Sequence, residues 1–368
     1  MTDCVRPVNR FFLVIFSVIL LFGSLTFFSA SFGLLGRDGP SFSSVVWGQI
    51  LFGLLPGALL AYFISRIQYT LWRRIAIVFF IATICLNLLL LAPSLSYEHG
   101  GAVRWLKFGS FTLQPSEFLK IAFILYLASW LSGTKERLRD AKYGLIPFGI
   151  ILGITTALLI FQRDTDTAVV MVFTALAMYF VAGAKLKDIL IIGVVGIMGL
   201  IALFYTRPYL MERFKVFLDP SRDPVKSGYQ VSQSLTAIGS GQVIGRGFGR
   251  SLQKFSRLPE PIGDSIFAVI GEEFGFAGST SVIVLFFMFV VQGIRIAIRA
   301  PDSFGRLITL GIVIMISIQS FINIASMLGL VPISGLPLIF ISHGGTALLS
   351  SLAAIGIVLN VSRHIRTN

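Results

Sequence analysis

Charged residues are scarce in this chain, and cysteine and histidine are scarcer still. Asp, Glu, Lys and Arg make up 13% of the 368 residues, about half the share of an average soluble domain. This shortage excludes an ordinary soluble globular protein. The two cysteines, Cys4 and Cys85, fall before the first apolar run and inside a later one, which argues against a disulfide framework. The three histidines and two cysteines show no spacing of a metal site.

Apolar residues make up 55% of the chain, and the mean hydropathy is +0.86. They form runs that mostly approach the roughly 20 residues that a membrane-spanning helix needs. The expected spans are residues 11–33, 44–65, 73–92, 115–132, 144–161, 168–183, 188–206, 265–292, 305–328 and 345–362. The first run is too long for the core of a signal peptide, so we interpret it as a permanent span. The sequence therefore predicts an all-α polytopic membrane protein with about ten transmembrane helices.

Basic residues lie mostly in alternate loops, which predicts the orientation of the chain. One set of loops holds Arg6, Arg10, Arg66, Arg73, Arg74, Lys135, Arg137, Arg139, Lys142, Lys185, Lys187, Arg295, Arg299, Arg306, Arg363 and Arg366, whereas the other short loops hold Arg37, Arg104, Lys107 and Arg163. Both termini of a single membrane domain, residues 1–368, are therefore expected in the cytoplasm, with a long loop at about 207–263 outside. The net charge of +13 reflects loops that face anionic lipid, and it requires no nucleic acid partner.

That long loop and the start of the next span form a polar, basic and glycine-rich segment, residues 229–278. Asp264 lies where the segment meets the span and is our candidate for a catalytic base, with a helix N-cap as the alternative. Lys254 and Arg257 stand within ten residues upstream, and cations so near would keep its carboxylate ionised. The glycine-rich run before it predicts a flexible outer loop whose cations can meet a diphosphate. These cations are Arg246, Arg250 and Lys254.

Other charged side chains fall at the edges of apolar runs. Glu117 and Lys120 are three residues apart and share a face of the fourth span. They form either part of a functional site or a structural salt bridge. Asp164 and Asp166 precede the sixth span, where both can cap the helix N-terminus, and Asp164 is also a candidate residue of a substrate-binding cavity. Glu272 lies eight residues after the candidate base on the same helical face, and we interpret it as part of a structural network.

Two further outer segments are unusual. Residues 93–114 carry Trp105 beside Arg104, a pattern typical of a short amphipathic piece lying in the membrane interface, and both are candidate site residues. Residues 331–345, VPISGLPLIFISHGG, have no formal charge and are broken by proline and glycine. Such backbone is tolerated at membrane depth only where protein or a cavity satisfies it, so the segment is expected to line a cavity. A lone histidine among its glycines is expected to make one hydrogen bond. The candidate site residues of the segment 331–345 are Ser342 and His343.

Four stretches together resemble the signatures of the SEDS family, the polytopic FtsW and RodA proteins of bacterial cell-wall synthesis. RWLKFGSFTLQPSEFLK is similar to the family's RW…QPSE…K segment, and QRDTDTAVV resembles its QPDxGTALV. The run YQVSQSLTAIGSG…GRGFGRSLQK…LPEPIGDSIFAVIGEEFGFAG resembles the longest signature, and GLVPISGLPLIFISHGG resembles GLxPxTGxxLPxxSxGG. SLQK before LPE, and IFAVIGEE, are more similar to the division branch, FtsW, than to the elongation branch, RodA.

The resemblance implies a SEDS-type bundle with a large extracellular loop, and a peptidoglycan glycosyltransferase that polymerises lipid II. It implies that Asp264 is the essential carboxylate and that Glu117 and Lys120 lie in a central cavity. The acceptor would be the GlcNAc 4-hydroxyl of lipid II and the donor a glycan on undecaprenyl diphosphate. Basic side chains or a divalent cation, Mg²⁺ or Mn²⁺, would balance the leaving diphosphate. The expected place is the bacterial cytoplasmic membrane, and the expected partners are a class B penicillin-binding protein and other divisome proteins.

The chain departs from the family pattern at several positions. Arg163 stands where the family has proline, Asp166 where it has glycine, Ile262-Gly263 where it has His-Thr, and His343 where it has tyrosine. The first two add charge to one loop, and the third change lies beside the candidate base. Two functions of other classes stay open: a lipid II flippase, which would need charged residues near mid-membrane, and a non-catalytic scaffold. Within the family, the alternative is an elongation-type polymerase.

Overall fold

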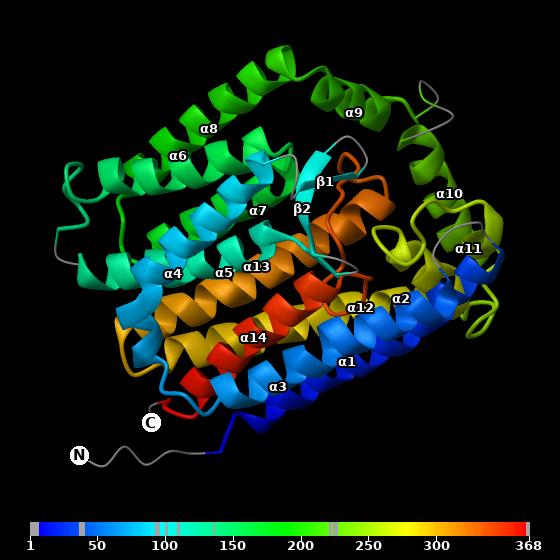
Figure 1. The fold of residues 1–368 in the computed structure, drawn as a ribbon, viewed down its shortest axis with the longest axis horizontal. Coiled ribbons are helices and arrows are strands. Elements are labelled where there is room, and N and C mark those ends of the chain that lie inside the picture. The colour runs from blue at the N-terminus through cyan, green and yellow to red at the C-terminus, as the bar shows by residue number, and fades with distance from the viewer. Residues whose placement is uncertain are drawn as a thin grey trace.

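The described part of the chain is a bundle of long helices that run roughly parallel to one another (Figure 1). The computed structural model describes residues 7–36, 41–92, 96–99, 102–108, 111–134, 137–220, 223 and 227–365. Cys4, Arg6, Arg37, Lys135 and Arg366, which entered the sequence analysis, lie outside these residues. In chain order, the long helices are α1 (Arg10–Ser31), α4 (Thr70–Leu88), α5 (Pro115–Gly133), α6 (Leu145–Phe161), α7 (Thr165–Val181), α8 (Leu186–Thr206), α12 (Ile266–Ile298), α13 (Ser303–Met327) and α14 (Gly345–Ser362).

A composite helix forms the second span. It consists of α2 (Phe42–Gly48), a π-helical stretch (Gln49–Leu54) and α3 (Leu55–Ile64). Short 3-10 turns, Phe32–Gly36 and Leu89–Leu91, extend α1 and α4. Each of the ten predicted spans is thus a helix, and the all-α polytopic prediction is confirmed. Within the described residues, seven helical runs are long and apolar enough to cross a membrane, and α6 and α7 are shorter apolar helices.

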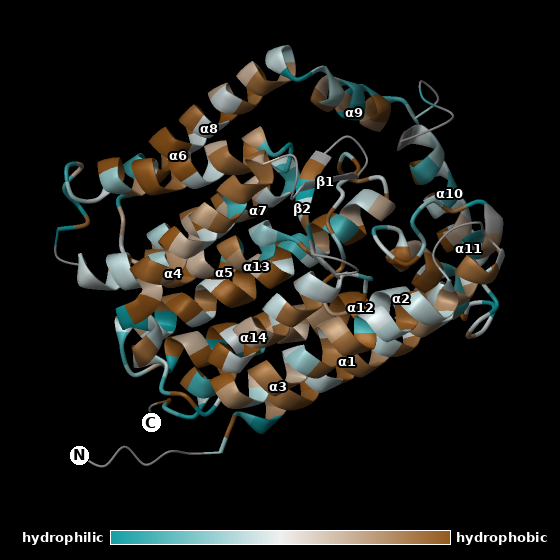
Figure 2. Ribbon diagram, in the orientation of Figure 1, coloured by the Kyte–Doolittle hydropathy of each residue, from teal (hydrophilic) through white to brown (hydrophobic). Residues whose placement is uncertain are grey.

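The core lies around α13 and α14, where most side chains are buried. α5 and α7 pack on α13, α3 packs on α14, and α1 packs on α12. α8 stands at the outer edge of the bundle (Figure 1), and Asp188 is its one buried residue. The long helices are mainly hydrophobic (Figure 2), and many of their large apolar side chains are exposed, as a lipid environment requires.

The long loop at about 207–263 is largely helical. It holds α9 (Pro208–Leu218), α10 (Ser227–Ser240) and the short α11 (Gln253–Ser256). α10 packs along α12 and also contacts α9 and α13. α9 and α10 therefore cover one end of the bundle, where Figure 1 also shows β1 and β2 nearby.

The segment at 93–114, which we expected to lie in the interface as an amphipathic piece, instead forms a small antiparallel sheet. Its strands are β1 (Ser96–His99), β2 (Ala102–Phe108) and β3 (Phe111–Leu113), in the order β1-β2-β3. Tyr97 pairs with Trp105, and Leu106 pairs with Leu113. Aromatic and β-branched residues favour strands, and side chains alternate between faces at period two. Leu106 is accordingly fully buried, whereas its neighbour Lys107 is exposed.

α12 is broken at Gly275, whose backbone (φ 66°, ψ −161°) is accessible essentially only to glycine. A break leaves helical N–H and C=O groups without partners. The loop at residues 242–247 supplies these partners. The bonds run from Phe276 N to Gln242 O (2.8 Å), Ala277 N to Val243 O (3.0 Å), Arg246 N to Glu272 O (3.0 Å) and Gly247 N to Glu273 O (2.9 Å). The loop is thereby fixed to the start of α12.

Candidate functional site

Three charged groups converge at the end of the bundle that α9 covers. Asp264 lies just before α12, outside the span, and is half-buried. A Cβ atom on Gly335, in the irregular segment between α13 and α14, would lie 3.7 Å from Asp264 Oδ2 and 3.7 Å from Asp166 Oδ2. The same point is 3.8 Å from Arg104 Nη1. The missing side chain of Gly335 therefore leaves room where two carboxylates and a guanidinium meet.

The surroundings of Asp264 raise its pKa to about 7. Burial is the largest cause, because it disfavours the charged form, and the negative charges of Glu260 and Asp166 act in the same direction. Arg104 and Arg213 lower the pKa and offset part of this increase. The carboxyl group thus changes its charge near neutral pH.

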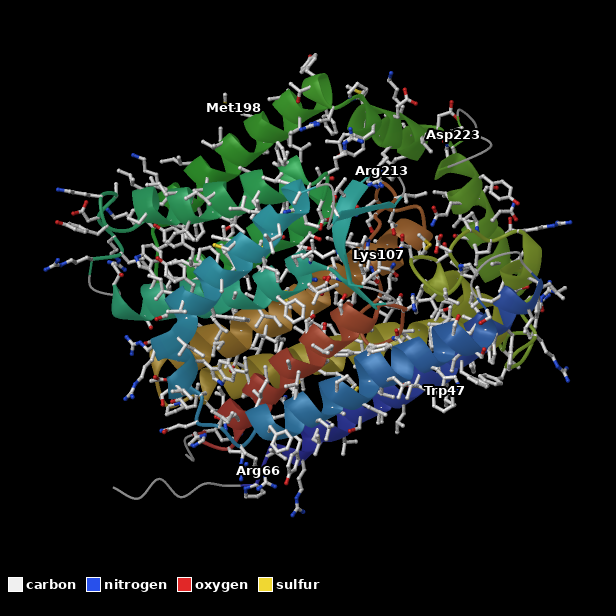
Figure 3. All side chains as sticks on the ribbon, in the orientation of Figure 1. Trp47, Arg66, Lys107, Met198, Arg213 and Asp223 are labelled. Atoms are coloured by element: carbon white, nitrogen blue, oxygen red, sulfur yellow. The ribbon has the colours of Figure 1, made fainter. Side chains whose placement is uncertain are left out.

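The cations beside Asp264 are not the ones that the sequence predicted. We expected Lys254 and Arg257 to keep the carboxylate ionised, yet the charges that lower its pKa are Arg104 and Arg213. Arg213 was missed because α9 lies some 50 residues upstream and only folding brings it to the site. A basic side chain on an amphipathic outer helix was the one signal available. Figure 3 shows Arg213 on α9 and Lys107 on β2 at the same end of the bundle.

Asp164 does not cap α7, contrary to the prediction. It stands at the N-cap position, but its side chain makes no capping hydrogen bond. Its carboxylate instead accepts a hydrogen bond from Ser116 Oγ (3.2 Å) and lies 3.7 Å from Arg104 Nη1. Arg104 also donates to the backbone oxygen of Arg163. Asp164 is buried, and its carboxylate links Arg104 of β2 to the start of α7.

Asp166 also departs from the predicted capping role. Its Oδ2 accepts a hydrogen bond from Gly335 N at 3.0 Å and lies 3.2 Å from Arg213 Nη1. Three elements therefore meet at this one side chain: α7, α9 and the segment between α13 and α14. Trp105, another predicted site residue, is partly buried on β2.

Lys254 is buried, so the prediction that it meets a diphosphate is not supported by its position. Its Nζ lies 2.6 Å from Glu273 Oε1 and donates to Ser29 Oγ at 3.1 Å, and both charged side chains are fully buried. Glu272 accepts hydrogen bonds from Ser251 Oγ (2.6 Å) and from two backbone amides of the same loop. This arrangement agrees with the structural network that we expected for Glu272.

The remaining basic candidates of this loop face outward. Arg246, Arg250 and Arg257 are exposed, and Arg246 Nε lies 3.7 Å from Glu272 Oε1. Their guanidinium groups are placed to meet an anion that approaches from outside. The loop is nevertheless held by its hydrogen bonds to α12 rather than built as a free loop.

Glu117 and Lys120 form a buried ion pair of 2.9 Å in α5. Lys120 Nζ also donates to Gln319 Oε1 on α13 (2.7 Å), and Ser350 Oγ on α14 donates to Glu117 Oε2 (3.2 Å). The pair therefore ties three central helices together, which is the structural alternative that the sequence left open.

A polar ladder on α13 continues from this pair to the candidate base. One turn after Gln319, Asn323 Nδ2 donates to Asp264 O and to Leu336 O, each at 2.8 Å. Gln319 Nε2 donates to Pro337 O at 3.3 Å. Asn323 is fully buried, so these bonds fix the backbone of Asp264 from the core of the bundle. The sequence missed this role, although two polar residues four apart in an apolar helix were a usable signal.

Ser342 and His343 belong to the irregular segment, which was expected to line a cavity; among its residues, Val331 and Ile333 line a pocket. Ser342 Oγ donates to Gly263 O at 2.7 Å and accepts from Leu338 N at 2.9 Å. His343 N donates to Ile262 O at 2.7 Å, and the exposed imidazole stacks on the Phe27 ring at 5.9 Å between centroids. Both residues therefore hold the segment against the loop that carries Asp264.

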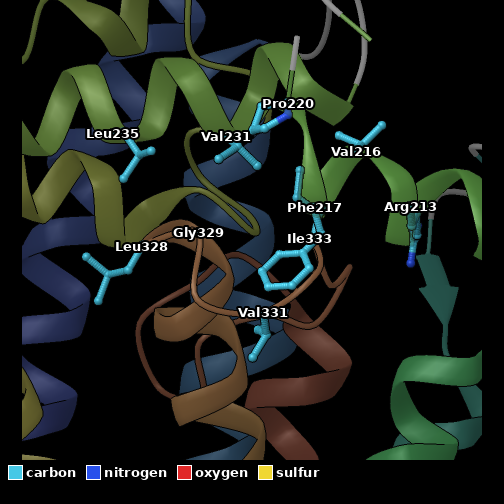
Figure 4. A pocket seen from close by; sticks show the side chains of 10 residues that line it. All are labelled: Arg213, Val216, Phe217, Pro220, Val231, Leu235, Leu328, Gly329, Val331 and Ile333. Carbon is cyan, nitrogen blue, oxygen red and sulfur yellow. The ribbon is translucent and has the colours of Figure 1, made fainter. Parts of the chain in front are cut away.

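An apolar pocket of about 100 Å³ lies beside Arg213 (Figure 4). Side chains from α9, α10 and the start of the segment after α13 line it, among them Phe217, Val231 and Val331. Among the residues that the structure describes, no group of three or more His, Cys, Asp or Glu side chains is placed to hold a metal ion.

A polytopic helix bundle with an ionisable carboxyl group and arginines at one end defines a membrane protein whose site acts at the membrane surface. The sequence comparison gives the family. The model of a cell cycle protein family, which takes in FtsW, RodA and SpoVE, matches residues 9–367, and the chain therefore belongs to this family.

Several relatives and solved structures cover nearly the whole chain. Stage V sporulation protein E of Bacillus subtilis is 40% identical over 86% of this chain and 87% of that protein. A probable peptidoglycan glycosyltransferase FtsW of Geobacter sp. (strain M18) is 39% identical over 82% of each chain. A chain of a peptidoglycan synthase complex that coordinates polymerization and crosslinking superposes with a TM-score of 0.79, at 26% identity over 97% and 98%. RodA of Thermus thermophilus has the same fold, with a TM-score of 0.71 at 24% identity over 98% of each chain.

Proposed function

We propose that this chain is a peptidoglycan glycosyltransferase of the division type, which polymerises lipid II into β-1,4 glycan strands. The family and the relatives named as FtsW support this activity. The assignment of the site rests on the ionisation of Asp264. A general base works best with a pKa near the working pH, and the pKa of this carboxyl is about 7.

In the proposed reaction, the 4-hydroxyl oxygen of the acceptor GlcNAc attacks the anomeric carbon of the donor glycan. The bond from that carbon to the diphosphate breaks with inversion, and undecaprenyl diphosphate leaves with its electron pair. Asp264, in its carboxylate form, takes the proton of the attacking hydroxyl. Arg104, whose charge already acts on Asp264, supplies positive charge to the leaving diphosphate.

We also propose a divalent cation, Mg²⁺ or Mn²⁺, as a cofactor of the reaction. Polymerisation in EDTA, followed by return of either cation, tests this point. The similarity to a peptidoglycan synthase complex supports a penicillin-binding protein of class B as the partner, within the divisome. The start of α1 and the end of α14 lie at the same end of the bundle, since Asn9 N donates to Ser362 Oγ at 3.1 Å. With the charge of the loops, this supports cytoplasmic termini in the bacterial cytoplasmic membrane.

The test is polymerisation of purified lipid II by the protein with its cognate penicillin-binding protein, whose transpeptidase is blocked by a β-lactam. Wild type and the folded Asp264→Asn variant are compared. We expect glycan chains from wild type and none from the variant. Chains from both would remove Asp264 from the role of base. Chains from neither, with an activator present, would favour a flippase or a scaffold instead.

A further inference from the structure

Asp166 is the side chain at the candidate site that the proposed reaction leaves without a role. It lies in the first turn of α7. Its carboxylate pairs with Arg213 on α9 at 3.2 Å and accepts the amide of Gly335 at 3.0 Å. These two contacts tie α9 and the irregular segment to α7.

The pair is more enclosed than an ordinary surface salt bridge. The side chains of Asp166 and Arg213 are 15% and 29% exposed. Arg213 also lies over the Tyr209 ring, at 6.0 Å from its centroid, and lines the apolar pocket beneath α9. Its guanidinium is thus held on the side that faces α7, and the pair has little freedom to separate while α9 stays packed.

Both members of the pair act on Asp264. Asp166 Oδ2 and Asp264 Oδ2 lie within 3.7 Å of the same point beside Gly335. Five residues from four elements contribute charge there: Arg104 from β2, Asp166 from α7, Arg213 from α9, and Glu260 and Asp264 from the loop before α12. Because the pair carries one charge of each sign, its two members change the ionisation of Asp264 in opposite directions.

We propose that Asp166 and Arg213 are positioning residues, which tie α9 and the segment between α13 and α14 against α7 and thereby set the conditions under which Asp264 works. This inference rests on the proposed function, in which Asp264 is the base. It predicts a signature that mere damage to the fold cannot produce. Replacing the two members one at a time moves the pH dependence of the reaction in opposite directions.

The signs follow from the charges. Asp166→Asn is isosteric, keeps an acceptor for the Gly335 amide and removes a negative neighbour of Asp264. The pKa of Asp264 then falls, and the acid limb of the pH–rate profile moves to lower pH. Arg213→Gln removes a positive neighbour, so the pKa increases and the limb moves to higher pH. Each shift is expected to be about half to one pH unit, and the double variant lies between the two single variants.

The experiment measures lipid II polymerisation from pH 5 to 9, roughly two units either side of the pKa of Asp264. It uses the full-length protein with its penicillin-binding protein. Asp140→Asn is the matched control, because this exposed acid lies in the loop between α5 and α6 and its profile should stay unchanged. Limbs that move in the same direction, or do not move in either single variant, overturn the proposal. Limbs that move apart support it.

A second readout is independent of activity. Val216 is buried on α9 against the irregular segment, so a Val216→Cys probe in a Cys4→Ser, Cys85→Ala background should react slowly with a maleimide. Labelling should accelerate several-fold in Asp166→Asn and in Arg213→Gln, but not in Asp140→Asn. Equal labelling rates in all of them refute the tie. If Asp264→Asn still polymerises, Asp264 is not the base, whereas the labelling rates still decide whether the tie exists.

Discussion

Replacement of Lys254 by methionine tests whether this residue serves the fold or the substrate. Methionine keeps an unbranched side chain of similar length but removes the ammonium. In the structure that ammonium lies 2.6 Å from Glu273 Oε1, with both side chains fully buried. The change therefore leaves a buried carboxylate whose remaining partners are Ser29 Oγ, at 2.7 and 2.6 Å from its two oxygens, and the amide of Ser251 at 3.4 Å.

The size of the effect follows from this burial. Removing one member of a buried ion pair costs about 3–5 kcal/mol, because the other charge stays without its counterion. The Ser29 hydroxyl keeps a hydrogen bond to the carboxylate, so we expect a loss of about 3 kcal/mol in the free energy of unfolding. In the double variant Lys254→Met/Glu273→Gln both charges are absent. Its stability should return to within about 1 kcal/mol of wild type.

The assay combines stability and activity on the same samples. Unfolding by SDS titration in mixed micelles gives the free energies, and lipid II polymerisation well below the unfolding midpoint gives the rates. If Lys254 is structural, the double variant regains both stability and most of the polymerisation rate. A double variant that is stable but inactive would refute this reasoning and return Lys254 to the diphosphate.

Three further predictions concern the site and its support. Polymerisation should increase about tenfold per pH unit below pH 7 and level off above it, because Asp264 must lose its proton and its pKa is about 7; a flat profile between pH 5 and 8, roughly, would contradict this. Asn323→Leu removes two buried bonds of 2.8 Å and should cost about 2–4 kcal/mol of stability, measured by SDS titration against Ser320→Ala, which loses only a bond within α13. Gly275→Ala should destabilise by about 3 kcal/mol or more, since its new Cβ would lie 2.4 Å from Gly245 N; a thermal midpoint equal to wild type would contradict the break in α12.

The helices could be predicted from the sequence because the information for a span is local. A run of apolar residues specifies its own helix in lipid, where each backbone group must find a partner within the segment. All ten expected spans were found for this reason, and Asp264 was recognised because it stands at the boundary of such a run. The sheet at 93–114 was missed because interfacial aromatic and basic residues suit more than one backbone conformation.

The partners of the site residues could not be predicted, because they come from distant parts of the chain. Asp166 meets Arg213, 47 residues later, and Gly335, 169 residues later. Helix capping was a reasonable expectation for Asp164 and Asp166, since a carboxylate before a helix has backbone amides within reach. Arginines on β2 and α9 compete for those carboxylates, and a charged partner makes a stronger hydrogen bond than an amide.

Asp264 is held by two kinds of contact, one from the core of the bundle and one from the outer elements, and the two respond differently to salt. On the core side, Asn323 and Gln319 of α13 hold the backbone through neutral hydrogen bonds, and both side chains are fully buried. On the outer side, Arg104 of β2 and Arg213 of α9 reach the region of the carboxylate, and both arginine side chains are partly exposed. Salt screens the outer contacts but leaves the core contacts intact. The ionisation of Asp264 is therefore adjustable from outside the membrane, whereas its position is set by the bundle.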